Sequence, residues 1–165
     1  MAYDKRTSTG IGGWLTFFIL TLAVFGPLRN LVETYANLYS NPAVGTFYGA
    51  RWSAVQALEW SAFLLSVGAA WFLAWRLVYV QNYGTLKLVR IGLWLSAFVP
   101  ITIEWLGIAL LAGISLGELL SASGRDLLRA LVYCAIWTAY LYRSERVANT
   151  YANDDPSQEL AAVFE

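Results

Sequence analysis

Four long apolar segments, separated by short polar connections, follow one another along the chain. They cover residues 11–35, 53–80, 89–111 and 127–142. A transmembrane helix takes about 20 mostly apolar residues, so we interpret each segment as one membrane span. The pattern predicts an all-α integral membrane bundle of four transmembrane helices within residues 1–151. Residues 152–165 are left as a short acidic tail.

Polar residues at the predicted boundaries resemble helix caps. Ser53 with Gln56, and Ser123 with Asp126, have the spacing of a capping box just before the second and fourth spans. The apolar stretch 113–124 has two interpretations. It either extends the third helix or forms a short helix lying in the membrane interface.

A face of small residues on the third predicted span indicates close helix packing. Gly92, Ser96 and Pro100 recur at four-residue spacing, followed on the same face by Glu104 and Gly107. Small residues on one face allow a neighbouring backbone to approach closely. We therefore expect bundle packing on this face.

Composition supports a membrane protein and excludes several other classes. Hydrophobic residues make up 58% of the chain and charged residues 13%, whereas a soluble domain is roughly half apolar and about a quarter charged. The 11 basic and 11 acidic residues cancel, which gives no electrostatic support for a nucleic-acid partner. Lys5 and Arg6 precede an apolar run that is longer than the core of a signal peptide, so we expect a retained first span.

Basic residues predict the orientation. With four spans, the side that holds both termini collects Lys5, Arg6, Arg76, Lys87, Arg90, Arg143 and Arg146, and the other side holds Arg29, Arg51, Arg125 and Arg129. The positive-inside rule then places both termini in the cytoplasm.

Charged residues inside the predicted spans are the main candidates for a site. They are Arg29, Glu33, Glu59, Glu104 and Arg129. A charge at the bilayer centre costs about 2.5–3.5 kcal/mol on insertion scales, so each needs a partner. We expect Glu104 to face the bundle interior and to pair with Arg29, or else with Arg129. The network either fixes helix register, or forms a proton or cation path or a polar-ligand site.

Catalytic chemistry has little support in this sequence. The chain has no histidine, and its single cysteine, Cys134, lies within the fourth predicted span. A thiol without a neighbouring base is not activated, and both lysines, Lys5 and Lys87, lie outside the spans. We therefore expect no enzyme activity, no catalytic residues, no metal and no cofactor.

Two motifs at the ends of the predicted bundle carry a resemblance to a known family. Residues 10–15 read GIGGWL directly before the first span, and residues 144–151 read SERVANTY after the fourth. They resemble the bacterial membrane family called domain of unknown function 2569, with its Gly-Gly-Trp-Leu start and its closing Tyr…Ser-x-Arg-Val-x-x-Thr-Phe pattern. Tyr151 stands where that pattern has Phe. The resemblance implies a four-span fold in the bacterial inner membrane and assigns no catalytic residues.

We expect the two motifs to form one cytoplasmic-face feature. Its residues are Gly12, Gly13, Trp14, Tyr140, Ser144, Arg146 and Val147. The glycines permit a tight backbone at membrane entry, and tryptophan favours the headgroup region. The feature is either a structural clasp between the two motifs or a docking surface for a larger membrane complex.

Taken with the lack of catalytic groups, these features predict a non-catalytic accessory or interaction subunit of a larger bacterial membrane assembly. Its partners would be the lipid bilayer and other membrane subunits. One alternative is a small oligomeric transporter or channel that uses the intramembrane arginines and glutamates. A second is a lipid- or quinone-contacting module.

The acidic tail carries a weak helix pattern. Asp155 and Pro156 suit a helix start, and Leu160, Val163 and Phe164 form a narrow apolar stripe. We expect either a short helix docked on a protein surface or a frayed tail, because so short a helix is marginal alone in water.

Overall fold

The computed structural model describes residues 10–151, and every regular element among them is a helix. The predicted all-α class is confirmed, whereas the predicted tail helix lies outside the described residues. The elements are α1 (Trp14–Leu20), the π-helix η1 (Thr21–Phe25), α2 (Gly26–Tyr39), α3 (Pro42–Tyr48), the 3₁₀-helix η2 (Gly49–Arg51), α4 (Trp52–Tyr79), α5 (Tyr83–Ala112), α6 (Leu116–Arg143) and α7 (Glu145–Tyr151).

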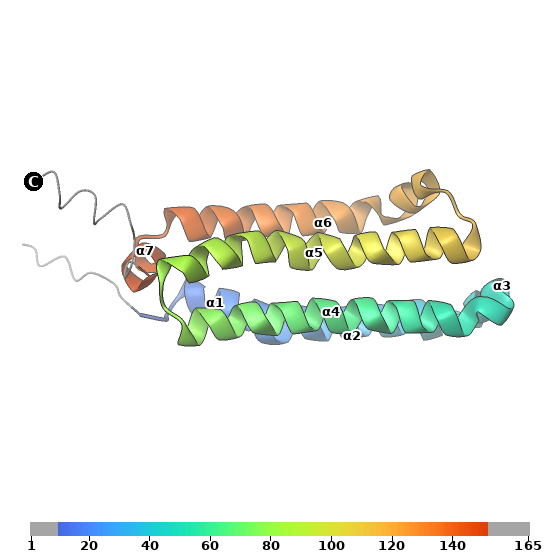
Figure 1. Ribbon diagram of the computed structural model, residues 1–165, viewed down its shortest axis with the longest axis horizontal. Helices are drawn as coiled ribbons and strands as arrows, with labels where there is room; N and C mark the ends of the chain where they lie inside the picture. Colours follow the sequence, from blue (N-terminus) through green and yellow to red (C-terminus); the bar gives the residue numbers. More distant parts are fainter. Residues whose placement is uncertain (1–9, 152–165) are drawn as a thin grey trace, which may run out of the picture.

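Four long rods lie side by side (Figure 1), the first being α1, η1 and α2 in succession. The short turns after α4 and after α5 make successive rods antiparallel, and α4 and α5 share the most extensive interface. Three stretches are long and apolar enough to cross a membrane: Trp14–Tyr39, Pro42–Tyr79 and Tyr83–Ala112. These support three of the predicted spans. Helix α6 equals α4 in length, with 28 residues each, but its first half carries several charges.

Two predicted helix caps are wrong. Helix α4 begins before Ser53, and no side chain caps its N-terminus. Helix α6 begins at Leu116, where Ser115 and Glu118 form a capping box through reciprocal hydrogen bonds. The stretch 113–124 therefore neither extends α5 nor forms a separate helix. It contains the turn at Gly113, whose φ of 70° favours glycine, and the first turns of α6.

Pro27 explains the irregular segment in the first rod. Proline has no amide hydrogen, so the carbonyl four residues earlier loses its donor. That carbonyl belongs to Ala23, and the indole N–H of Trp71 on α4 donates to it at 2.9 Å. The π-helix η1 lies directly before this proline. Trp71 of α4 thus replaces the hydrogen bond that Pro27 removes from the first rod.

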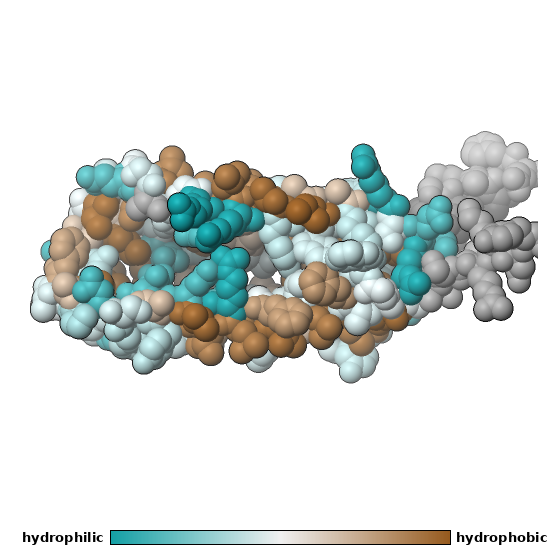
Figure 2. All heavy atoms as spheres, turned by 180° about the vertical axis from the view of Figure 1, so that it is seen from behind, coloured by the Kyte–Doolittle hydropathy of each residue, from teal (hydrophilic) through white to brown (hydrophobic). Residues whose placement is uncertain are grey.

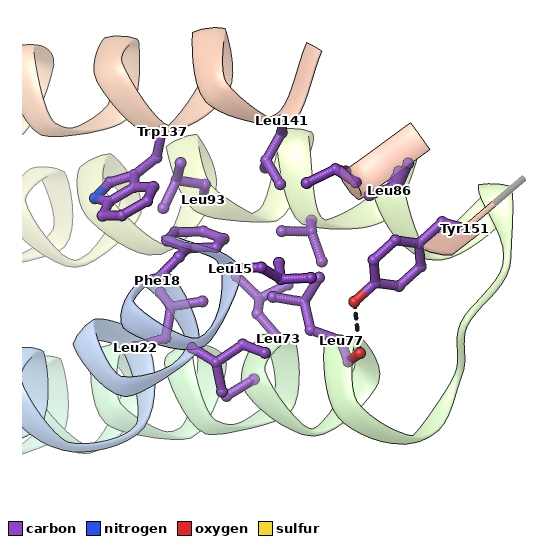
Figure 3. Packing of buried hydrophobic residues seen from close by; sticks show 14 of the residues in the cluster. Leu15, Phe18, Leu22, Leu73, Leu77, Leu86, Leu93, Trp137, Leu141 and Tyr151 are labelled. Atoms are coloured by element: carbon purple, nitrogen blue, oxygen red, sulfur yellow. Dashed lines mark hydrogen bonds between the residues drawn. The ribbon is translucent and has the colours of Figure 1, made fainter. Parts of the chain in front are cut away.

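The main cluster of buried hydrophobic residues lies in one half of the bundle. Its labelled members in Figure 3 are Leu15, Phe18, Leu22, Leu73, Leu77, Leu86, Leu93, Trp137, Leu141 and Tyr151. All come from the half that holds Gly10 and Tyr151, which we call the packed end. We call the opposite half, with α3 and the α5–α6 turn, the open end.

Helix α6 shows this asymmetry most clearly. Among its described side chains, the buried ones are Cys134, Trp137 and Leu141, all in its second half. At the open end, α4 still buries Val55 and Ala62, but α6 contributes no described buried side chain there. The bundle therefore packs as four rods at one end and loses α6 from its core at the other.

Gly107 gives a direct test of the α4–α5 packing. A Cβ atom at Gly107 would overlap the side chain of Leu58 on α4, whereas one at Gly68 would meet nothing within 4 Å. Gly107→Val should lower the free energy of unfolding by about 1–3 kcal/mol through overpacking, and Gly68→Val should not. Thermal melting in detergent, followed by fluorescence-detected size exclusion, measures the difference. Equal melting temperatures for the two variants would contradict this packing.

Candidate functional site

Two buried acids from neighbouring helices meet at the open end. Glu59 on α4 is only 8% exposed, Glu104 on α5 is half-buried, and their carboxyl groups lie near each other. An ionised carboxylate only accepts hydrogen bonds, so these two groups can bond to each other only when at least one of them is protonated. Glu104 therefore does have a polar partner, but the partner is another acid.

The same helix faces build the core further along. On α4, Ala62 follows Glu59 by one turn and is buried, and on α5 Pro100 precedes Glu104 by one turn and is buried. The two acids thus occupy positions that apolar residues fill at the packed end. This substitution of acids for apolar residues leaves the open end without a continuous hydrophobic core.

The predicted pairing of Glu104 with Arg29 or Arg129 is wrong. Arg29 binds Glu33 on its own helix, with Nε and Nη2 each 2.8 Å from Oε1. Arg129 binds Asp126, with Nη1 to Oδ1 at 2.9 Å. Partners three or four residues away on one helix need little further ordering, which favours these local pairs over contacts between helices.

The five residues of the expected network therefore fall into three separate groups. They are the Glu59–Glu104 carboxyl pair, the Arg29–Glu33 ion pair of α2 and the Asp126–Arg129 ion pair of α6. Sequence reasoning did not assign Asp126 to the site. Its three-residue spacing from Arg129 was the available signal.

Both ion pairs are about half exposed. The side-chain exposures are 55% and 49% for Arg29 and Glu33, and 54% and 62% for Arg129 and Asp126. Figure 2 views the α2 and α6 side of the molecule, and hydrophilic side chains gather there on both edges of a hollow. Helix α2 packs on α4, and α6 packs on α5, but α2 and α6 share no extensive contact. We call this region the α2/α6 face.

Contacts at the packed end set the register of the two edges. The hydroxyls of Thr21 and Tyr133 are 3.1 Å apart, and the rings of Phe18 and Trp137 stack at 4.5 Å. From the Thr21–Tyr133 contact, helix rise places Arg29 about 12 Å and Asp126 about 11 Å towards the open end. The two ion pairs therefore lie at similar heights on opposite edges.

The two best-formed pockets of the described residues lie away from the carboxyl pair. The best-formed depressions of the described surface are open to their surroundings, one lined by Gly13, Trp14 and Phe17, the other by α3 and Asn41 before it. Neither is lined by Glu59 or Glu104. The hollow on the α2/α6 face is therefore distinct from both depressions.

The two end motifs meet at the packed end. The amide of Gly10 donates to Thr150 Oγ1 at 3.0 Å, and Gly12 lies against the guanidinium of Arg146, where a Cβ atom would overlap it. Gly13 precedes α1 with a φ of 56°, and the hydroxyl of Ser144 accepts a bond from the amide of Val147, which is fully buried. The remaining predicted motif residues differ in exposure: Tyr140 is half-buried against Trp137, and Trp14 is 68% exposed.

Side chains from other elements donate hydrogen bonds to carbonyl groups at the C-terminal ends of three long helices. Tyr151 donates to the carbonyl of Leu77 in α4 at 2.6 Å (Figure 3), Arg90 donates to that of Leu141 in α6 at 2.9 Å, and Arg51 donates to that of Leu111 in α5. These carbonyls belong to the last turns, which have no partners inside their helices. Sequence reasoning did not identify these three contacts.

This architecture defines an all-helical bundle with membrane-spanning character, closed at one end by the two motifs. A family model described as protein of unknown function (DUF2569) matches residues 8–152. The chain therefore belongs to this family, as the end motifs predicted. No curated protein and no solved structure significantly matches the chain.

Substitution of Tyr151 tests how much its hydrogen bond stabilises the packed end. Phenylalanine fits the family pattern at this position but would leave the Leu77 carbonyl without its donor, which costs about 1–3 kcal/mol. Burial raises the pKa of Tyr151 above its usual value, so the hydroxyl stays protonated and the loss should be constant between about pH 6 and pH 9. Thermal melting of Tyr151→Phe measures it. Tyr79→Phe is the matched control, because Tyr79 is 73% exposed, and an equal effect of both changes would refute the role of this bond.

Proposed function

We propose that this protein is a non-catalytic accessory subunit of a larger bacterial membrane assembly, and that another subunit covers its α2/α6 face. One observation carries the proposal: two ion pairs on this face are about half exposed. A bilayer does not solvate such charges, and charged side chains at membrane depth generally face protein or water. A partner helix supplies that cover.

The membrane depth of these charges supports the proposal. Arg29 lies about 22 Å along the first rod from Trp14, within a hydrocarbon core of about 30 Å. It also belongs to a stretch apolar enough to cross the membrane. Leu31 and Val32, beside the ion pair, are exposed as well. This face has both the apolar surface and the paired charges that suit another protein helix.

In this proposal α6 is the fourth span and the packed end is cytoplasmic. Helix α6 has the length to cross, and it runs beside α5. The packed end carries Arg76, Lys87, Arg90, Arg143 and Arg146, whereas Arg51 and Arg125 mark the open end. This excess favours the cytoplasmic side for the packed end and is typical of a protein of the bacterial inner membrane.

An oligomeric transporter is the second candidate, and the Glu59–Glu104 pair favours it. Membrane carboxyl groups that share a proton are the kind of group that proton relays use. A transporter built on this pair needs further copies of the chain, because four helices do not enclose a pathway around it. Catalysis has no place in either candidate, since the chain has no histidine and Cys134 is fully buried.

The topology is tested with reporter fusions. Fusions after Val147 and within residues 39–50 should report opposite sides of the membrane, with the first in the cytoplasm. Alkaline phosphatase and green fluorescent protein fused at both sites give reciprocal signals. A periplasmic signal after Val147 would refute this orientation.

The partner is tested by photo-crosslinking in native membranes. A photoreactive amino acid at Val32 on α2 or at Val132 on α6, both exposed, should form an adduct with a different protein of defined mass. Leu64 on α4 is the control, because it is 65% exposed and belongs to neither α2 nor α6. Adducts should be several-fold more abundant from the first two sites.

Mass spectrometry of the adducts separates the two candidates. A recurrent foreign chain supports the subunit proposal. Adducts only between copies of this chain, together with flux by the purified oligomer in liposomes, support the transporter. Equal adduct yields at all three sites would refute a specific partner for the α2/α6 face.

A further inference from the structure

We infer that the α2/α6 face takes a transmembrane helix of another subunit that carries one basic residue, arginine or lysine, in its outer third. This inference rests on the proposed function and specifies the chemistry of the partner. Two observations support it: α2 and α6 do not pack extensively on each other, and neither ion pair of the described residues includes the acids Glu59 and Glu104.

Charge complementarity identifies the occupant. Within residues 10–151, the two ion pairs that form use Arg29 and Arg129, and neither includes Glu59 or Glu104. When one of the two carboxyl groups is protonated and the other is ionised, the pair carries one negative charge. A single guanidinium or ammonium group balances that charge, and a guanidinium can bind both carboxyl groups through its several donors.

The depth of the carboxyl pair defines where the basic residue lies in the partner. Glu59 is about 10 Å along α4 from its start at the open end. A partner helix therefore presents its cation at about the same depth, in the third of the membrane near the open end. Nearer the packed end, the stack of Phe18 on Trp137 closes the bundle, so a cation placed there would meet apolar side chains.

The shape of the face excludes a small solute as the preferred occupant. The best-formed depressions of the described surface lie elsewhere, and the hollow in Figure 2 opens along the side of the bundle. A helix contacts both edges of such a surface over several turns, whereas a small ion would leave the half-exposed pairs on α2 and α6 uncovered. The ion pairs Arg29–Glu33 and Asp126–Arg129 then lie at the edges of the helix–helix contact.

Synthetic partner helices test this inference without knowledge of the natural partner. Single-span polyleucine helices carry one arginine in the outer, middle or inner third, one aspartate in the outer third, or no charge. Each has a cysteine at the same fixed position in its outer third and is co-expressed with the full chain bearing Val32→Cys. Native Cys134 is fully buried and stays in place. Oxidative crosslinking in membranes gives the readout.

The outer-third arginine helix should crosslink about tenfold more than the uncharged helix, which corresponds to about 1.4 kcal/mol. The other charged helices should not exceed the uncharged one. Glu59→Gln with Glu104→Gln should abolish the preference. Glu118→Gln with Glu145→Gln is the matched control, because both of these acids are exposed, and it should leave the preference intact.

Two results would overturn the inference: equal crosslinking of the charged and uncharged helices, or a preference that survives Glu59→Gln with Glu104→Gln. Moving arginine along the probe requires no substitution in the site, so the test stands even where the double variant folds poorly. Failure of the proposed function is distinguishable. In that case native membranes yield no foreign adduct, while the outer-third arginine helix still crosslinks.

Discussion

The last carbonyl groups of an α-helix have no partner inside that helix, and where water is scarce each needs a donor from elsewhere in the chain. Tyr151 supplies one to α4, Arg90 to α6 and Arg51 to α5. Each bond joins the end of one helix to a different element. The packed end depends on two of them, because Tyr151 and Arg90 fix α7 on α4, and α5 on α6. The hydrogen bonds that satisfy the helix ends are thus the same contacts that hold the helices together.

This fixed packed end allows the open end to differ. The main buried cluster extends from Tyr151 to Leu22 and Leu93, and further towards the open end α4 and α5 carry Glu59 and Glu104 on their core-facing sides. Helix α6 is secured by Trp137 and Leu141, so its first half can remain apart without loss of the fold. A surface shaped to receive another helix is therefore compatible with a stable bundle, because stability and the candidate site use different halves of the same helices.

Sequence reasoning predicted the helical class, the family and the contact between the end motifs, because these follow from apolar length and from local motifs. It also identified Gly92 and Gly107 as points of close approach, and both would overlap α4 side chains if a Cβ were added. It failed on the partners of Glu104, since helical spacing reveals Arg29–Glu33 but not which helix faces which. It also missed the hydrogen bond of Tyr151. The family pattern has phenylalanine at this position, and the sequence does not show which carbonyl group the tyrosine hydroxyl would reach.

The cost of charge in a bilayer distinguishes the candidate functions most directly. Local pairing neutralises Arg29 and Arg129 without hiding them, so a chain alone in lipid would keep two polar pairs half exposed. In a transporter, water along an enclosed path would solvate these exposed pairs, but α2 and α6 do not close the bundle on that side. A protein partner removes the lipid contact and, with one cation, also satisfies Glu59 and Glu104. The same contact then resolves all three groups of charges, which is why we favour an accessory subunit.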